Sequence, residues 1–400
     1  MDITPILKLM AERKASDVFF SANTTIQIKI EGVLHPVSQQ VLSGDQVKRV
    51  AYRLMDAERI ARFETDLEMN FGHYLEGTGN FRVNVFRQRG DVAIVIRYIK
   101  EKASTIADLN LPPVLEELIS SRLGMILVVG STGSGKSTTL SSMLESRNQS
   151  RPGHILTVED PIEYVFKHNK SMVNQREVGI DTHSYSHALK NAMREAPDVM
   201  MIGEIRDRET MQHALNYAQA GHLILSTLHA NNSYHVMNRI INFFPHEARS
   251  SLLLDLSVSL KAVISQRLIK GVDGKLVPAV EVLLNTNRIA ELIRTGQIDL
   301  IKEAMENSVS EGSQTFEQAL FRLYKDGKIS LQEALSNADS PTNLAWRINN
   351  DDKAYQKMED ERGGGGGSTP ATHSAEQPKS SRDEEVTFDF DLHVNNDEPD

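Results

Sequence analysis

Nine residues, from 130 to 138, have the types and spacing of a loop that binds phosphate groups. They follow the apolar run at residues 125–129 and precede residues 139–145, which have the composition of a helix start. Glycines in such a loop let main-chain N–H groups converge on one point, where the helix N-terminus adds partial positive charge. Lys136 is predicted to reach the β- and γ-phosphates and Ser137 to ligate Mg²⁺. The predicted nucleotide-binding loop consists of Gly130, Ser131, Thr132, Gly133, Ser134, Gly135, Lys136, Ser137 and Thr138.

A cluster of carboxylates is expected at the same sheet edge as this loop. Glu159, Asp160 and Glu163 directly follow the apolar run at residues 155–158, and ligand chemistry in open α/β sheets sits at the carboxyl ends of the strands. Nucleotide hydrolysis needs a carboxylate that positions or activates water, so the cluster is a candidate for that role. The alternative is that Glu159 and Asp160 only cap a turn started by Pro161.

Two further strand ends carry polar residues that could face a nucleotide. Residues 199–202 are similar to a Walker B strand in which the usual terminal Asp is a Gly, so that Glu204 is the acid beside the metal. Residues 223–227 are bracketed by His222 and His229. Two histidines beside a nucleotide site could sense the γ-phosphate, although packing and turn roles explain them equally well.

Positive charge for the transition state is not evident in this part of the chain. Arg82 and Arg97 lie on predicted strands within the first hundred residues, on either side of a turn at Gly90. Taken alone, they are typical solvated surface arginines. They become candidates only if this region faces a nucleotide.

Composition excludes several classes of protein. The chain has no cysteine, so it has no disulfide framework and no thiolate metal site. No apolar run approaches the roughly 20 residues that span a bilayer, and residues 1–13 lack the pattern of a signal peptide, so we expect a cytoplasmic protein. The formal net charge is −10, of which residues 351–400 contribute −9. The nearly neutral remainder disfavours a nucleic-acid partner.

The same acidic residues 351–400 are predicted to be a disordered tail, because their composition offers too little apolar surface to bury. The tail either only solvates the chain or docks a partner through the apolar positions of residues 386–392, which read Val-Thr-Phe-Asp-Phe-Asp-Leu.

Periodicity divides the rest of the chain into unlike parts. Residues 1–102 alternate short helices with strands, which predicts a small α+β domain, and residues 103–113 with their paired prolines predict a linker. From residue 114 to 285, apolar strands alternate with helices, which predicts an α/β P-loop core on a parallel sheet covered on both faces. Residues 286–350 predict a small group of short helices at the C-terminal side.

Four segments together resemble the Walker A, Asp box, Walker B and His box of secretion ATPases. In chain order they read Gly-Ser-Thr-Gly-Ser-Gly-Lys-Ser-Thr, Val-Glu-Asp-Pro-Ile-Glu, Gly-Glu-Ile-Arg-Asp and Gly-His-x₄-Thr-Leu-His-Ala-Asn. The resemblance covers about residues 1–350 and is closest to the type IV pilus retraction ATPases of the PilT/PilU group. It implies a RecA-like core and a hexameric ring that hydrolyses ATP with Mg²⁺ on the cytoplasmic side of the inner-membrane pilus machine.

The resemblance also implies roles for individual residues. Glu163 corresponds to the catalytic glutamate of the Asp box and Glu204 to the Walker B acid, which with Ser137 serves the metal. His229 corresponds to the His-box residue that senses the nucleotide. Arg82 and Arg97 match two arginines of the N-terminal domain that reach the γ-phosphate in this family.

Departures from the family pattern favour its PilU branch. Residues 16–20 read Ser-Asp-Val-Phe-Phe where Ser-Asp-Leu-His-Leu is common in PilT, and typical PilT lacks the acidic tail. Residues 292–296 resemble a helical Ala-Ile-Arg-Ala-Gly motif that retraction needs, but differ from it at several positions, and Arg194 matches a core arginine. The absence of cysteine excludes the four-cysteine zinc module of extension and type II secretion ATPases.

The sequence leaves three functions open. The first is a hexameric motor that powers pilus retraction and twitching motility through an inner-membrane platform protein, possibly together with a PilT-type partner. The second is an accessory subunit that docks on a PilT-type motor and whose own ATPase activity is secondary. The third, a nucleic-acid translocase, fits the phosphate loop but not the charge.

Overall fold

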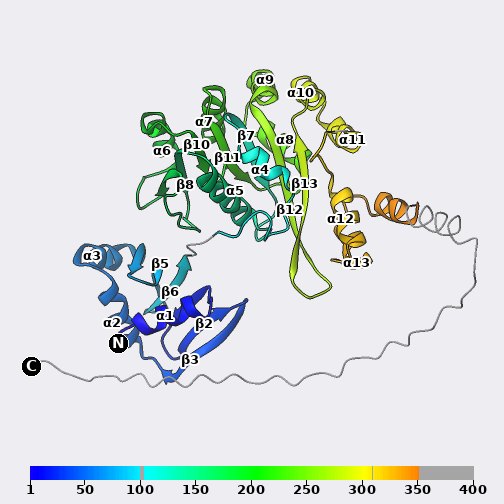
Figure 1. Cartoon of the computed structure of the whole chain (residues 1–400). Coiled ribbons are helices and arrows are strands. Elements are labelled where there is room, and N and C mark those ends of the chain that lie inside the picture. Colours follow the sequence, from blue (N-terminus) through cyan, green and yellow to red (C-terminus); the bar gives the residue numbers. More distant parts are fainter. Residues whose placement is uncertain (100–102, 309, 351–400) are drawn as a thin grey trace, which may run out of the picture. The chain divides into compact units, whose positions relative to one another are not determined.

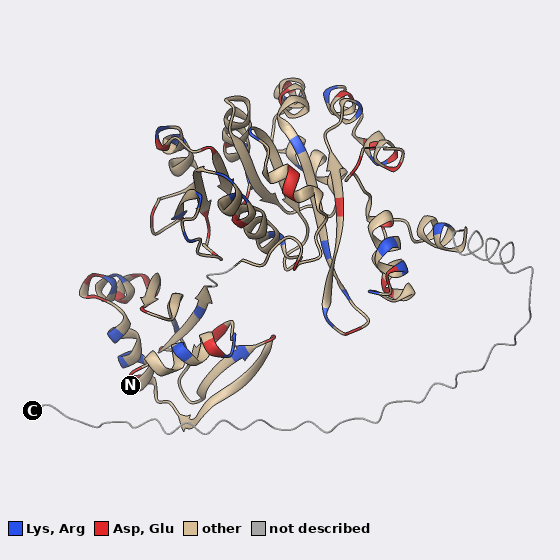
Figure 2. Cartoon of the chain, in the orientation of Figure 1, with Lys and Arg blue, Asp and Glu red and all other residues tan. Residues whose placement is uncertain are grey.

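The computed structural model describes residues 1–99, 103–308 and 310–350 (Figure 1). They fall into two compact units that divide between residues 101 and 102, and each unit is described by itself. Lysine, arginine, aspartate and glutamate are distributed along the helices and strands of both units (Figure 2). None of the described helices combines the length and the apolar content that a membrane crossing needs. The predicted acidic tail lies outside the described residues.

The first unit is an antiparallel sheet with three helices. Its six strands have the order β3-β2-β1-β6-β5-β4, and every neighbouring pair is antiparallel. Alternate residues of β5, among them Phe81, Val83 and Val85, are buried, as expected for a sheet with one face on the core. The elements are α1 (Thr4–Glu12), β1 (Asp17–Phe20), β2 (Thr25–Ile30), β3 (Val33–Val41), α2 (Gly44–Leu54), α3 (Ala57–Asp66), β4 (Glu68–Leu75), β5 (Gly79–Gln88) and β6 (Asp91–Ile99).

The predicted α+β class of this unit is confirmed, although the sequence signals for β3 and α3 are weak. β3 contains Pro36, which disfavours a strand assignment except at a sheet edge, and β3 is an edge strand. α3 is capped by Asp56, whose side chain accepts a hydrogen bond from the Arg59 N–H. This cap is hard to recognise in the sequence, because the segment contains many other charged residues.

The second unit is built on a sheet of seven strands with the order β13-β12-β7-β11-β10-β8-β9. Six of them run parallel, and only the edge strand β13 is antiparallel to its neighbour β12. The strands are β7 (Gly124–Val129), β8 (Gly153–Glu159), β9 (Ser171–Glu177), β10 (Val199–Ile202), β11 (Leu223–Leu228), β12 (Leu260–Lys270) and β13 (Leu276–Leu284).

The predicted parallel sheet is present in six strands, and the structure adds one antiparallel edge strand, β13. Only residues 271–275 separate β12 from β13, and a parallel pair needs a crossover of a dozen residues or more. The short turn forces a hairpin. Pairing with β13 continues to the end of β12, which is eleven residues long. This strand therefore reaches both the phosphate loop and the C-terminal helices.

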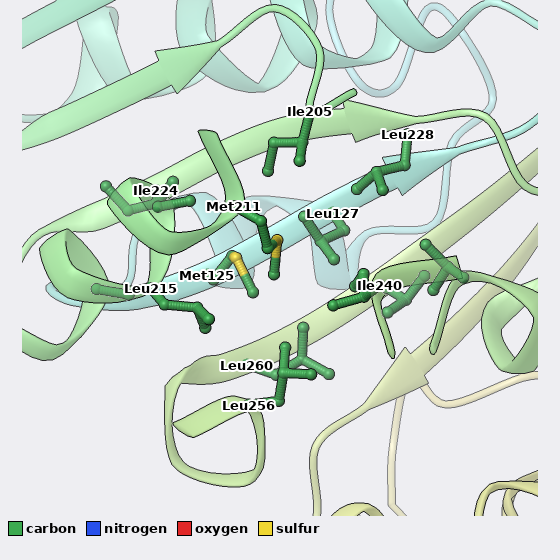
Figure 3. Close-up of a cluster of buried hydrophobic side chains, with 14 of the residues drawn as sticks. Met125, Leu127, Ile205, Met211, Leu215, Ile224, Leu228, Ile240, Leu256 and Leu260 are labelled. Carbon is green, nitrogen blue, oxygen red and sulfur yellow. The ribbon is translucent and has the colours of Figure 1, made fainter. Parts of the chain in front are cut away.

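Helices cover both faces of this sheet, as the alternation of strands and helices predicts. Met125 and Leu127 of β7 belong to a cluster with Leu215, Ile240 and Leu256 on one face (Figure 3), whereas Ile126 and Val128 pack with α4 and α5 on the other. The helices are α4 (Val114–Ile119), α5 (Lys136–Ser150), α6 (Tyr185–Ala192), α7 (Arg208–Gln219), α8 (Ser233–Asn242), α9 (Arg249–Ser259), α10 (Asn287–Arg294), α11 (Ile301–Glu306), α12 (Phe316–Lys325) and α13 (Leu331–Ser336).

The C-terminal helices fall into two groups by what they pack against. Ile293 of α10 and Ile301 of α11 are buried in the same cluster as β7. Phe316 and Leu320 of α12 form a separate cluster with Ala334 of α13 and with Ile269 and Ala279 on the β12–β13 hairpin. The helices α12 and α13 therefore rest on the far part of the strand that passes the phosphate loop.

Candidate nucleotide-binding site

The phosphate loop joins the end of β7 to the start of α5. Gly130 has φ 153° and Gly135 has φ 87°, in the region that side chains rarely adopt. A Cβ at Gly130 would lie 2.4 Å from the Ser134 Oγ and 2.5 Å from the Gln266 carbonyl oxygen. Glycine is therefore required here by the close approach of β12. The first N–H groups of α5 have no partner within the helix, so they can bind an anion.

Lys136 and Ser137 begin α5 and face the loop and the carboxylates. The Lys136 Nζ donates hydrogen bonds to the Gly130 carbonyl oxygen at 3.0 Å and the Ser131 carbonyl oxygen at 2.8 Å. Burial lowers the pKa of Lys136, and the charges of Glu204 and Glu163 partly offset this effect. The Ser137 Oγ donates to the Glu163 Oε1 at 3.1 Å. The predicted metal-ligating serine and the predicted catalytic glutamate are thus direct neighbours.

A pocket of about 530 Å³ brings the predicted residues of the second unit together. Glu163, Glu204 and His229 line it with loop residues from Thr132 to Thr138. They follow three different parallel strands, β8, β10 and β11, whose carboxyl ends meet at one edge of the sheet. The predicted cluster at this edge is therefore present.

Glu204 is held between two nitrogen groups. The Arg206 Nε lies 2.8 Å from its Oε2, and the His229 Nε2 lies 3.2 Å from its Oε1. The Glu204 side chain is only 13% exposed, so the two contacts fix a carboxylate that has little solvent around it. Arg206 also lines the pocket, and the sequence analysis gave it no role, although its place two residues after Glu204 is a usable signal.

The structure separates the two histidines. His229 follows the carboxyl end of β11 and lies in the pocket, whereas His222 precedes the other end of the strand. The His222 Nδ1 lies 3.1 Å from the Tyr217 carbonyl oxygen. The idea that both histidines act around one nucleotide is therefore wrong for His222, because β11 spans the sheet between them.

Tyr185 explains the glycine at the end of the Walker B strand. A Cβ at Gly203 would lie 2.7 Å from the Tyr185 Oη and 3.3 Å from the Val158 carbonyl oxygen. A side chain at position 203 is excluded unless Tyr185 moves. Tyr185 lines the pocket, and burial raises the pKa of its phenol. Tyr185 has no signal in the sequence, because it starts α6 outside the four motifs.

The segment that carries Glu163 is held by β9, a strand that the sequence analysis also missed. The Glu177 carboxylate accepts from the Ile162 N–H at 3.0 Å. The Gln175 side chain donates to the Tyr164 carbonyl oxygen at 2.8 Å and accepts from the Phe166 N–H at 2.9 Å. These contacts fix the backbone on both sides of Glu163.

Glu159 lines the pocket but is almost fully buried, and two side chains donate to its carboxylate. It is 7% exposed, and its Oε1 accepts from the Thr157 hydroxyl at 2.6 Å and from the Gln175 amide at 3.1 Å. Burial raises the pKa of Glu159 from 4.5 to about 7, against the opposing effect of these two donors. The carboxyl group is therefore partly protonated near neutral pH.

This raised pKa predicts a pH-dependent stability. Folding favours the neutral carboxyl group, so its contribution is full below pH 4.5 and is lost as the pH rises towards 7. Glu159→Gln mimics the neutral group. Between pH 5 and 8, the free energy of unfolding of the nucleotide-free wild type should fall by about 2 to 3 kcal/mol relative to that of Glu159→Gln.

Urea unfolding at each pH measures this difference. Glu145→Gln, which changes a carboxylate on α5 outside the pocket, is the matched control and should keep the wild-type profile. Equal pH profiles for wild type and Glu159→Gln would contradict the protonation of Glu159.

Arg82 and Arg97 lie in the first unit as directly opposed residues of β5 and β6. The Arg97 Nε donates to the Asp17 Oδ1 at 2.7 Å, and the Arg97 side chain is 63% exposed. The structure thus brings the two predicted arginines together on one sheet. Arg194 lies in the second unit on a short 3₁₀ segment (Met193–Glu195) and is exposed.

A second cavity adjoins the phosphate loop and the start of α5. It measures about 550 Å³ and shares Gly135, Thr138 and Leu268 with the first pocket. Its walls come from residues 108–111, from the β12–β13 hairpin and from Gly327 and Lys328. Val277 and Pro278 contribute apolar surface, so the cavity can hold a planar apolar group beside a bound phosphate chain.

The residues of the first pocket fit a magnesium ion. Ser137 offers a hydroxyl oxygen 3.1 Å from a Glu163 carboxylate oxygen, and Glu204 offers a second carboxylate in the same pocket. Hard oxygen ligands beside a phosphate site are what Mg²⁺ prefers. Together, the fold, the loop and these carboxylates define a P-loop ATPase.

Comparison with known proteins places the chain within this class. Residues 1–362 match the family of type II/IV secretion system proteins. The chain is 44% identical over 349 residues to the type IV pilus ATPase PilU of Pseudomonas aeruginosa, covering 87% of this chain and 91% of PilU. It is 39% identical to the retraction ATPase PilT of the same organism, covering 86% of this chain and 100% of PilT.

A solved structure agrees with these relatives. The crystal structure of the pilus retraction motor PilT with bound ADP matches with a TM-score of 0.81 and 39% identity, covering 86% of this chain and 99% of the other. The chain belongs to the type II/IV secretion system protein family, and its similarity to PilU and PilT extends over both units.

Proposed function

We propose that this chain is a ring-forming motor that hydrolyses ATP with Mg²⁺ and powers retraction of a type IV pilus, and with it twitching motility. The observation that carries the proposal is the similarity to PilU and PilT over more than four fifths of the chain, together with the pocket that unites the loop with Glu163, Glu204 and His229. The motor acts as a hexamer in the cytoplasm, peripherally attached to the inner membrane at the pilus base.

The residues around the phosphate loop divide the work of hydrolysis. The main-chain N–H groups of the loop and the Lys136 ammonium group bind the phosphates, and Ser137 and Glu204 would hold Mg²⁺. When bound there, the ion would supply positive charge that neutralises the phosphate oxygens. Glu163 orients the attacking water and accepts its proton. The Ser137 hydroxyl donates to Glu163, so the residue that would hold the metal and the residue that activates water are in direct contact.

The remaining site residues respond to the γ-phosphate. His229, 3.2 Å from Glu204, senses whether that phosphate is present. Arg82 and Arg97 supply positive charge at the transition state from the N-terminal domain, here assigned to residues 1–102. The neighbouring cavity of about 550 Å³ takes the adenine base.

The motor acts on the pilus through an inner-membrane platform protein, and a PilT-type ATPase is a possible partner. A second candidate function is an accessory subunit that docks on such a partner and contributes little hydrolysis. It is supported by residues 292–296, which differ from the Ala-Ile-Arg-Ala-Gly motif that retraction needs.

A motility assay tests the proposed motor. In a bacterium whose own copy of this gene is deleted, the wild-type gene should restore the twitching zone and Glu163→Gln should not. If Glu163→Gln restores motility fully while PilT is present, hydrolysis by this chain is not needed and the accessory function replaces the motor. Native mass spectrometry of the purified chain with a non-hydrolysable ATP analogue should give six copies, and a monomer would contradict the ring.

A further inference from the structure

The strand β12 passes directly behind the phosphate loop. The Gln266 side chain accepts a buried hydrogen bond from the Thr139 hydroxyl of α5 at 2.6 Å, and the Gln266 carbonyl oxygen is the atom that excludes a side chain at Gly130. The next residue, Arg267, projects to the opposite face because successive side chains of a strand alternate. This places a single positive charge between β12 and the C-terminal segments.

Arg267 joins three segments that are distant in the sequence. Its Nη1 donates to the Asn337 carbonyl oxygen at 2.5 Å, and its Nη2 lies 2.5 Å from the Asp339 Oδ1. The Nη2 also donates to the Asn231 carbonyl oxygen at 3.3 Å. The Cζ of the Arg267 guanidinium group lies over the Phe316 ring of α12, 3.9 Å from the ring centre. A planar, multidentate cation is suited to this arrangement.

Asp339 completes the contact from the other side. Its Oδ2 accepts from the Asn232 side-chain amide at 3.1 Å. Asn232 is buried, and its side-chain oxygen caps α8 by accepting from the His235 N–H. The segment 229–232 begins with His229, which contacts Glu204, and ends with Asn232, the cap of α8. Arg267 binds Asn231 and Asp339 binds Asn232, so the pair holds the end of this segment.

We propose that the Arg267–Asp339 pair is a latch that positions the segment carrying His229, so that the helices α12 and α13 set the geometry of the nucleotide site. The inference rests on the role proposed above for His229. Arg267 and Asp339 are positioning residues, because neither lines the pocket that holds the phosphate loop. A shift of α13 moves Asp339 and, through Asn231 and Asn232, changes the contact between His229 and Glu204.

Steady-state kinetics of the purified full chain test the latch. Arg267→Met keeps an apolar stem over Phe316 and removes the charge, and Asp339→Asn removes the partner charge at constant size. Both should lower kcat for ATP by about tenfold while KM changes less than twofold, because the phosphate loop and the cavity beside it are untouched. Arg267→Lys should recover only part of kcat, since lysine cannot contact all three segments.

The matched control is Lys302→Met. The Lys302 Nζ pairs at 3.0 Å with the Glu317 Oε1 on α12, and the same oxygen accepts from the Ser340 N–H at 3.0 Å. This change therefore disturbs the segment beside Asp339 but removes none of the contacts that Arg267 and Asp339 make to Asn231 and Asn232. It should keep kcat near the wild-type value. If it lowers kcat as much as Arg267→Met, loss of packing explains the effect and the latch is overturned.

Two further measurements separate the latch from the proposed role of His229. Amide hydrogen exchange of residues 231–236 should speed up at least tenfold in Arg267→Met and Asp339→Asn but not in Lys302→Met. His229→Ala should lower kcat, and adding it to Arg267→Met should cause no further loss. A loss in His229→Ala with none in Arg267→Met or Asp339→Asn overturns the latch, whereas wild-type turnover in His229→Ala overturns the sensing role and the inference with it.

Discussion

Glu163→Gln should bind ATP about as well as the wild type and hydrolyse it at least about 100-fold more slowly. The amide has the size of the carboxylate and can still accept the Ser137 hydrogen bond, which is 3.1 Å long in the wild type. It cannot take a proton from water. Steady-state phosphate release gives the turnover, and titration with a fluorescent ATP analogue gives the affinity.

Glu145→Gln is the control for this experiment, because Glu145 lies on the same helix as Ser137 but does not line the pocket. It should keep turnover within twofold of the wild type. Wild-type turnover in Glu163→Gln would mean that another carboxylate of the pocket, such as Asp160, positions the water.

Lys136→Ala should weaken ATP binding about 100-fold or more, which corresponds to about 3 kcal/mol. The Lys136 ammonium group donates hydrogen bonds to two carbonyl oxygens of the loop. A phosphate chain bound in the loop would accept hydrogen bonds from the same ammonium group in their place. Without the lysine, the loop keeps its N–H groups but loses the only formal positive charge among residues 130–138. Isothermal titration calorimetry with ATP and Mg²⁺ measures the loss.

Lys170→Ala serves as the comparison, since the exposed Lys170 does not line the pocket and its amine donates to the Ser150 carbonyl oxygen at 3.4 Å. Its affinity for ATP should equal that of the wild type. If Lys136→Ala also binds ATP normally, the phosphates do not lie where the loop predicts.

The order of strands and motifs along the chain could be predicted, because each strand and each motif is a short contiguous segment with its own residue pattern. Residues 199–202 form β10 as predicted, and the phosphate loop joins a strand to a helix as its glycines indicate. Strand ends of a parallel sheet share one edge. For this reason the joint position of Glu163, Glu204 and His229 followed from the order of the strands alone.

The supports of the site could not be predicted, because they are contacts between distant residues. Tyr185 reaches Gly203, and Gln266 reaches the phosphate loop from a strand more than a hundred residues later. β9 is polar at several positions, since its side chains bind the segment around Glu163 instead of filling the core. Such roles become visible only when the pairing of strands is known.

The two histidines show the same limit in one motif. The spacing of His222 and His229 around β11 is compatible with a shared role. A strand of six residues nevertheless places the two residues that flank it at opposite ends of the parallel strands, and only the carboxyl end adjoins the nucleotide site. Arg82 and Arg97 are expected only on either side of a turn at Gly90, and the structure places them directly opposite each other, because the turn sets the register of the β5–β6 hairpin.

The most direct test of the account is the ATP turnover of the purified chain alone, with no PilT-type protein present, measured with and without Mg²⁺. The account predicts hydrolysis that requires Mg²⁺ and that disappears in both Lys136→Ala and Glu163→Gln. Absence of turnover in the wild-type chain under conditions where it binds ATP, or turnover that persists in Glu163→Gln, would contradict it.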